Sequence, residues 1–125
     1  MRNGRNDRGF TLLEILVAVT LLSIGLLGVA GLTVGIMRGN RHSNMTTTAT
    51  TLAQDKIEDV RANGYSGTPA GTFPEPYNNA DFPFYKRVTV VTDNTPSPNM
   101  KTVTVTVYWN LDASSVALET VLTDD

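Results

Sequence analysis

An apolar stretch near the N-terminus constrains this chain more than any other feature. Residues 10–37 contain one charged side chain, Glu14, and no proline. As a helix, the stretch would measure roughly 42 Å, which exceeds a hydrocarbon core of about 30 Å. An ordinary secretory signal has a shorter apolar region of about 7–15 residues with a small-residue cleavage site after it. The stretch therefore predicts a helix that spans a membrane.

Arginines flank the apolar stretch on both sides. Three precede it, opposed only by Asp7, and two follow it. An excess of arginine ahead of a span favours a cytoplasmic N-terminus and an exported C-terminus. A single-pass topology with an exported head is therefore expected. The arginines are Arg2, Arg5 and Arg8 before the stretch, and Arg38 and Arg41 after it.

Glu14 is the only charge inside the apolar stretch. A charge at the bilayer centre costs about 2.5–3.5 kcal/mol, and such residues are functional candidates. Glu14 lies about one helical turn from Phe10, near the cytoplasmic edge, where the cost is lower. Its position alone leaves two interpretations open. It is either a functional charge or an acid placed favourably at a helix N-terminus, which is worth under about 1 kcal/mol.

A specific motif surrounds Glu14: a short basic leader, a glycine, a phenylalanine, a glutamate four residues later, and an unbroken apolar helix. It resembles the class III signal of type IV prepilins and type II secretion pseudopilins. The resemblance implies that a prepilin peptidase cleaves between Gly9 and Phe10 and N-methylates Phe10. It also implies that Glu14 pairs with the N-terminal amine of a neighbouring subunit in a filament. The matching residues are Arg8-Gly9-Phe10-Thr11-Leu12-Leu13-Glu14-Ile15-Leu16-Val17-Ala18.

Simple electrostatics fit a pairing role for Glu14. Two unit charges about 4 Å apart attract by about 4 kcal/mol at an effective dielectric constant of 20. Desolvation of both groups offsets much of that gain. We therefore expect such a pair to set the register between subunits more than to stabilise them.

Four glycines, Gly25, Gly28, Gly31 and Gly35, lie in the apolar stretch. Gly31 and Gly35 form a G-x-x-x-G step, which allows close approach of helices in membranes. Glycine is also common in membrane helices without a packing role. Many major pilins carry a proline in this helix, and none is present in this chain.

The helix is expected to continue beyond the apolar stretch as an amphipathic segment. No proline interrupts residues 10–63, so one helix of about 50 residues is predicted. Asn63 and Gly64 form a C-terminal stop signal. Apolar residues recur at steps of three and four, which is typical of a helix with one apolar face. These residues are Met45, Ala49, Leu52, Ala53, Ile57 and Val60.

A connecting loop is predicted at residues 64–83, which are rich in glycine, proline and asparagine. Three strand patterns follow, with turn-forming links between them. Such strands form an antiparallel meander whose apolar face would pack on the amphipathic half-helix. The strands are expected at residues 85–92, 101–109 and 116–122, with Val103, Val105, Val107 and Trp109 on one side of the second.

The predicted fold class is α+β, with a long N-terminal helix packed on a three-stranded antiparallel meander; this is the pilin fold. The expected parts are a leader peptide at 1–9, a transmembrane or filament-core helix at 10–37, an amphipathic half-helix at 38–63, a connecting loop at 64–83 and the antiparallel sheet at 84–125. Residues 38–125 would form the globular head.

Four further segments refine the resemblance: 22–28, 52–58, 61–63 and the strand 100–109. They are similar to the PilV family of type IV pilus modification proteins and to the minor pseudopilin I of type II secretion systems. Major pilins often have a disulfide-closed loop near the C-terminus. This chain has no cysteine, which favours a minor subunit.

The composition argues against several other functions. Downstream of His42, five basic residues face ten acidic ones, so no nucleic-acid partner is expected. Thiol chemistry is excluded because cysteine is absent. His42 is the only histidine, so no metal site, no cofactor and no enzymatic activity are expected.

The leading hypothesis is a minor pilin that helps a type IV pilus to initiate or assemble through helix packing after peptidase cleavage. The alternatives are a minor pseudopilin of a type II secretion system and an uncleaved single-span protein with an exported binding domain. The resemblance implies a bacterial inner-membrane location with the head in the periplasm, followed by entry into a pilus or pseudopilus. The implied partners are other pilin or pseudopilin subunits, the prepilin peptidase, the inner-membrane assembly platform and membrane lipid.

Overall fold

A computed structural model describes residues 9–124, which form one helix and four strands. The chain divides into two units, Met1–Asn40 and Arg41–Asp125, and each is described here by itself. Residues 1–8 of the predicted leader, including Arg2, Arg5 and Arg8, lie outside the described part.

Helix α1 (Leu12–Gly67) supplies the first unit and the opening element of the second. Within the first unit every described residue is exposed, including the large apolar side chains of the stretch. This helix is long and apolar enough to cross a membrane. The first unit therefore buries no core of its own, and its apolar surface requires lipid or protein around it.

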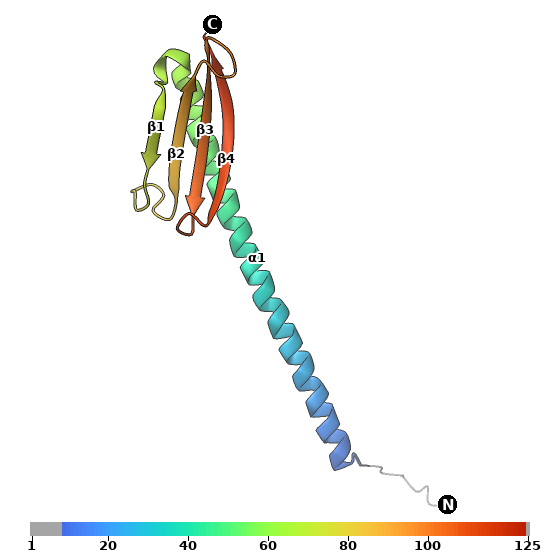
Figure 1. Ribbon diagram of the computed structural model, residues 1–125. Helices are drawn as coiled ribbons and strands as arrows, with labels where there is room; N and C mark the ends of the chain where they lie inside the picture. The colour runs from blue at the N-terminus through green and yellow to red at the C-terminus, as the bar shows by residue number, and fades with distance from the viewer. Residues whose placement is uncertain (1–8, 125) are drawn as a thin grey trace, which may run out of the picture. The chain divides into compact units, whose positions relative to one another are not determined.

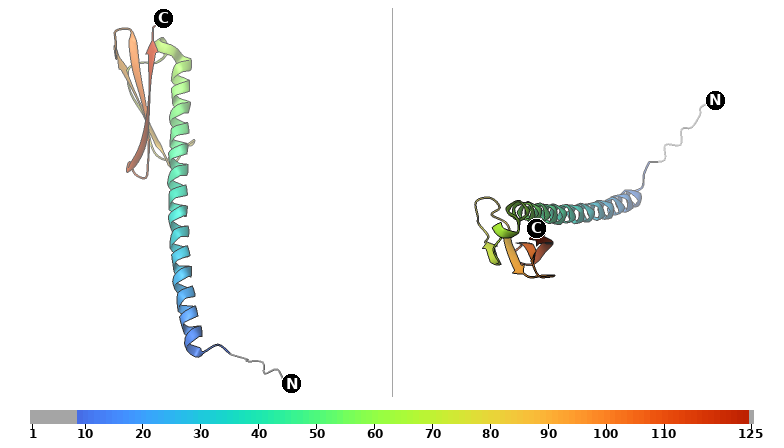
Figure 2. Two further views of the ribbon diagram at one scale, coloured as in Figure 1. Left: turned by 90° about the vertical axis from the view of Figure 1, so that its right-hand side faces the viewer. Right: turned by 90° about the horizontal axis from the view of Figure 1, so that it is seen from above.

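In the second unit, residues 41–67 of α1 cover one face of an antiparallel sheet (Figures 1 and 2). The sheet has the order β1-β2-β3-β4, so neighbours in sequence are neighbours in space. This arrangement confirms the predicted α+β, pilin-like fold. The strands are β1 (Gly71–Glu75), β2 (Lys86–Asp93), β3 (Met100–Trp109) and β4 (Ser114–Thr123).

The core lies between the helix and the sheet, as the sequence pattern predicts. Ala49 and Ala53 are fully buried, and their small size lets the helix approach the strands closely. On β3, burial alternates strictly, with Val103, Val105 and Val107 inaccessible to solvent. The predicted apolar face of the half-helix is thus confirmed. The buried cluster is Ala49, Ala53, Ile57, Val60, Val91, Val103, Val105, Val107, Trp109 and Leu122.

The prediction of three strands is wrong, because the sheet has four. The additional strand β1 lies in the segment 64–83, which was expected to be a loop, and it pairs antiparallel with β2. Its sequence, Gly-Thr-Phe-Pro-Glu, has one β-branched residue, Thr72, and contains glycine and proline, which are depleted in strands. Its pairing with β2 stabilises this strand more than its own residue preferences do.

The end of the helix also differs from the prediction. Gly64 has φ 69° and ψ −175°, so regular helix is interrupted there, and one further turn extends α1 to Gly67. Positive φ is accessible to glycine without steric cost, which explains this residue at the interruption. The expected stop at Asn63 and Gly64 is therefore a kink followed by a final turn.

Two buried cations bind the sheet to the helix. Arg87 on β2 donates an Nη1 hydrogen bond to the Leu52 carbonyl at 2.9 Å. Lys101 on β3 donates from Nζ to the carbonyls of Tyr65 (2.9 Å) and Thr68 (2.8 Å). Lys101 thereby binds carbonyls at the C-terminal end of α1 and just after it, where the helix supplies few N–H donors, whereas Arg87 binds a carbonyl within the helix. The head therefore uses charged groups, and no disulfide, to fix its helix to its sheet.

Candidate functional site

The sequence places the candidate processing site at the bond between Gly9 and Phe10. Both residues are exposed and non-helical, and α1 begins only at Leu12. A Cβ atom built on Gly9 would meet nothing within 4 Å. The bond therefore lies in exposed backbone outside the helix, where a protease can reach it.

Thr11 caps the helix directly after this bond. Its Oγ1 accepts a hydrogen bond from the Glu14 backbone N–H at 3.2 Å, and its carbonyl accepts from the N–H groups of Glu14 (3.1 Å) and Ile15 (3.2 Å). These are the contacts of an N-cap residue. Cleavage after Gly9 would leave Phe10 and Thr11 in place, so the cap would survive processing.

The cap was missed in the sequence analysis, although a signal for it was present. Thr11 and Glu14 are spaced as Thr-x-x-Glu ahead of an apolar stretch, which is the capping-box pattern. The structure contains the half of this box in which Thr11 accepts from the backbone of Glu14.

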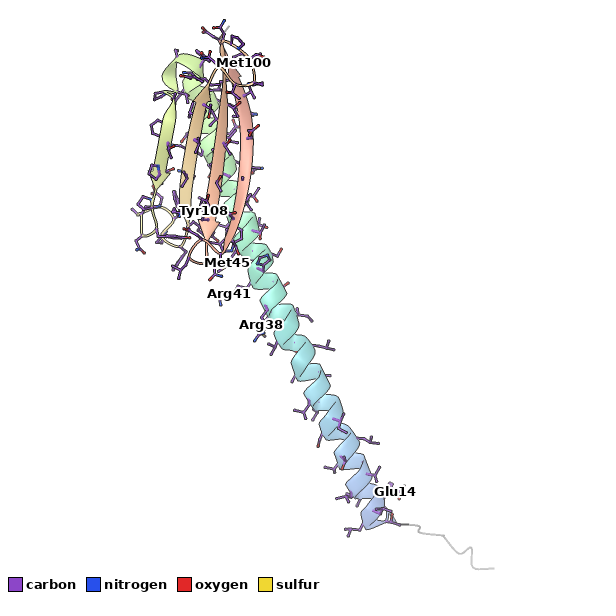
Figure 3. All side chains as sticks on the ribbon, viewed as in Figure 1. Glu14, Arg38, Arg41, Met45, Met100 and Tyr108 are labelled. Atoms are coloured by element: carbon purple, nitrogen blue, oxygen red, sulfur yellow. The ribbon has the colours of Figure 1, made fainter. Side chains whose placement is uncertain are left out.

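The Glu14 carboxylate is not used by the cap. Within residues 9–124 it makes no hydrogen bond and no ion pair. It does lie in the first turn of α1, where the helix dipole favours an acid. The Glu14 carboxylate therefore has no partner in the described part of the chain, and its side chain lies at the start of α1 (Figure 3).

Unlike the Glu14 carboxylate, three hydroxyl groups of the apolar stretch have hydrogen-bond partners within the helix. Thr20, Ser23 and Thr33 each donate to the carbonyl four residues earlier, at 2.8, 2.8 and 3.0 Å. Such bonds satisfy a hydroxyl inside lipid, where water is absent. Glu14 is thus the polar side chain of the described stretch that has no internal partner.

The four glycines of the stretch line up on one side of the helix. At about 100° per residue, Gly25, Gly28, Gly31 and Gly35 fall within an arc of about 120°, and Glu14 falls in the same arc. A Cβ atom at any of the four would meet nothing within 4 Å in this chain. Their small size therefore serves no contact within the described chain. The structure places Phe10 and Glu14 together at the start of α1 and the glycines further along it.

The head offers little reactive chemistry. The His42 ring lies 6.5 Å from the Trp109 ring, centroid to centroid, which is an aromatic packing contact. Among the described residues no group of three or more histidine, aspartate or glutamate side chains is arranged to hold a metal. Its strongest charge contacts, Arg87 with Glu75 and Lys86 with Asp112, join structural elements.

A long apolar helix followed by an α+β head is a pilin-like fold, and the helix is long and apolar enough to cross a membrane. Residues 4–30 match the family model described as the prokaryotic N-terminal methylation motif. The match supports a type IV pilin-like class III signal and hence a protein of the type IV pilin or pseudopilin kind. Comparison with curated proteins and with solved structures found no match.

Proposed function

We propose that this chain is a minor pilin, a structural subunit that helps a type IV pilus to initiate and assemble. In this proposal, prepilin peptidase cleaves between Gly9 and Phe10 and methylates Phe10. The subunit waits in the inner membrane with its head in the periplasm, and then enters the filament through its apolar helix. The resemblance to PilV-type minor pilins and the absence of cysteine support the minor role.

The observation that carries the proposal is the combination of an exposed apolar helix with one unpartnered acid near its capped start. The exposed apolar part of this helix needs lipid or neighbouring helices around it. The Glu14 carboxylate needs a cation when water is excluded. A methylated amine at Phe10 of a neighbouring subunit would supply this cation.

The glycine face supports the same role. A helix that presents Gly25, Gly28, Gly31 and Gly35 on one side allows another backbone to approach closely. Glu14 shares that side. The face would therefore combine close packing with the single charge that sets register against other subunits.

Intact mass spectrometry of the protein extracted from membranes tests the proposal. In cells that contain the peptidase, we expect the mass of residues 10–125 plus one methyl group; in cells that lack it, we expect the full chain. A full-length mass in both strains would overturn the proposal in favour of an uncleaved single-span protein. Replacement of Gly9 by alanine should preserve the full-length mass in the presence of the peptidase.

Deletion of the gene then separates a pilus from a secretion system. Loss of surface pili with normal protein secretion is the expected result. Normal pili with failed secretion would identify a minor pseudopilin of a type II system.

A further inference from the structure

The two edges of the sheet in the head differ in their protection. β1 is a short edge strand of 5 residues, whereas β4 at the other edge has 10. An unpaired edge offers a row of N–H and C=O groups to any extended chain. Proteins usually blunt such edges with short strands, proline, lysine or bulges. Here only the β1 edge is blunted.

The register identifies the backbone groups that face outward from β4. Bonding alternates along an antiparallel pair, so every second residue turns its N–H and C=O away from the neighbouring strand. The Asp124 N–H donates to the Asn99 carbonyl at 3.1 Å, and this pair continues the β3–β4 register. Counting along β4 from this pair gives the residues with outward groups. They are Ser115, Ala117, Glu119, Val121 and Thr123.

The same alternation, carried across the sheet, describes the β1 edge. Glu75 and Phe73 bond to β2, and Thr72 and Pro74 face outward. Proline has no N–H and is tolerated in a strand where that position faces solvent. Only Thr72 therefore offers an outward N–H within β1.

The β4 edge has no comparable protection. The strand contains no proline, glycine or lysine, and it pairs with β3 over its whole length without a bulge. Val116 and Leu118, on the helix side, are only partly buried, and Val121 on the opposite face is 42% exposed. One further strand beside β4 would cover these side chains and satisfy the free backbone groups.

We propose that β4 is a docking edge that an extended strand of a different polypeptide joins in antiparallel orientation. The partner strand carries a basic side chain opposite Glu119 and apolar or β-branched residues around it. Glu119 is the only charge on β4, and in the described chain its carboxylate accepts a hydrogen bond from Thr104 at 3.4 Å. A base on the partner would complement this acid.

A second copy of this chain is a poorer partner for the same edge. Antiparallel pairing that matches all five outward residues of one β4 with those of another brings Glu119 opposite Glu119. Like charges that lie directly opposite destabilise a strand pair. The charge of the edge therefore selects a different chain. This inference stands on the sheet alone and does not depend on the filament role.

The test uses the full-length protein in detergent micelles and a labelled peptide as long as β4, built of alternating threonine and valine with lysine at its centre. Fluorescence anisotropy measures binding, and amide hydrogen exchange locates it. We expect binding that protects the amides of Ala117, Glu119 and Val121. A peptide with glutamate at its centre should bind about fivefold more weakly.

Variants separate edge pairing from loss of fold. Ala117→Pro removes an outward N–H and leaves the bonds to β3, so it should weaken binding about tenfold. Val121→Pro should act in the same way if the first variant folds poorly. Ala117→Thr, which keeps the N–H, and Thr72→Pro, on the opposite edge, should bind as the unmodified protein does.

Three results would overturn the proposal. The first is that the lysine peptide does not bind. The second is that both proline variants fold and bind the lysine peptide as tightly as the unmodified protein does. The third is that the lysine and glutamate peptides bind equally tightly. A dimer of the unmodified chain joined through β4 would show that the partner is a second copy and would also contradict the proposal.

Discussion

Arg87 donates two hydrogen bonds to the Glu75 carboxylate, from Nε to Oε2 at 2.6 Å and from Nη2 to Oε1 at 2.7 Å. A third bond from the same guanidinium reaches the Leu52 carbonyl of α1. One side chain of β2 therefore holds both the edge strand β1 and the helix. The Arg87 guanidinium also lies 4.6 Å from the centre of the Phe82 ring, which adds a cation–π contact.

Glu75→Gln should destabilise the head by about 1–3 kcal/mol, because it weakens charge-assisted bonds to a buried arginine. Urea unfolding followed by circular dichroism measures the change. Glu58→Gln is the matched control, since the ion pair of Glu58 with Arg61 has side chains 74% and 56% exposed. Exposed pairs contribute about 0–1 kcal/mol. Equal effects of the two variants would contradict the role of Glu75.

Acid should weaken the head through the same pair. The hydrogen bonds from Arg87 hold the pKa of the Glu75 carboxyl below its usual range, and those from Lys86 do the same for the pKa of Asp112. A carboxyl with a lowered folded-state pKa stabilises the protein above its unfolded pKa, and this stability is lost as the pH falls through the folded pKa. The urea concentration at the midpoint of unfolding should therefore decrease once the pH is lowered below about 4.

Glu75→Gln provides the comparison for this pH dependence. The variant should lose less stability between neutral and acid pH than the unmodified protein, because one of the two carboxyls is gone. Parallel pH curves for the two proteins would show that Glu75 does not contribute.

Lys101→Met should destabilise the head by about 2–4 kcal/mol. The methionine keeps the volume of the side chain and removes the donors to the carbonyls of Tyr65 and Thr68. The last turn of α1 should then exchange its amides faster, as measured by hydrogen exchange. Lys56→Met is the control and should be nearly neutral, because the Lys56 side chain makes no hydrogen bond and no ion pair within the described residues.

Glu14→Gln should lower incorporation into filaments about tenfold, because a neutral amide pairs poorly with a cationic amine. Immunoblots of sheared filaments and of membranes measure the ratio. The Thr11 cap uses the backbone N–H of residue 14, so this variant keeps it. Thr11→Ser also keeps the cap and should assemble normally. Normal assembly of Glu14→Gln would contradict the pairing role.

Long periodic segments of the sequence predicted the fold well. The alternation on β3 and the steps of three and four on the half-helix each reflect burial of one face, and the structure confirms both. β1 could not be predicted in this way, because its stability depends on the pairing with β2 and on Arg87, both distant in sequence.

The buried cations show a second limit of pattern reading. Lys101 lies two residues before Val103, so its phase placed it on the apolar face, and Arg87 lies likewise two residues before the buried Thr89. The sequence therefore predicts which face of the sheet these two side chains occupy. It does not predict their hydrogen-bond acceptors, because the carbonyls and the carboxylate belong to other elements. For the candidate site, the motif around Gly9 and Glu14 is visible in the sequence, whereas the hydrogen bonds of the Thr11 cap are seen only in the structure.

The internal hydrogen bonds of Thr20, Ser23 and Thr33 bear on the proposed passage of the chain from the membrane into a filament. Every hydroxyl donor among these three is already occupied by the helix itself, so none demands a new acceptor when acyl chains are exchanged for neighbouring protein. In the proposed passage, one apolar environment would replace another, and these hydroxyl groups would add little to the free energy of the transfer.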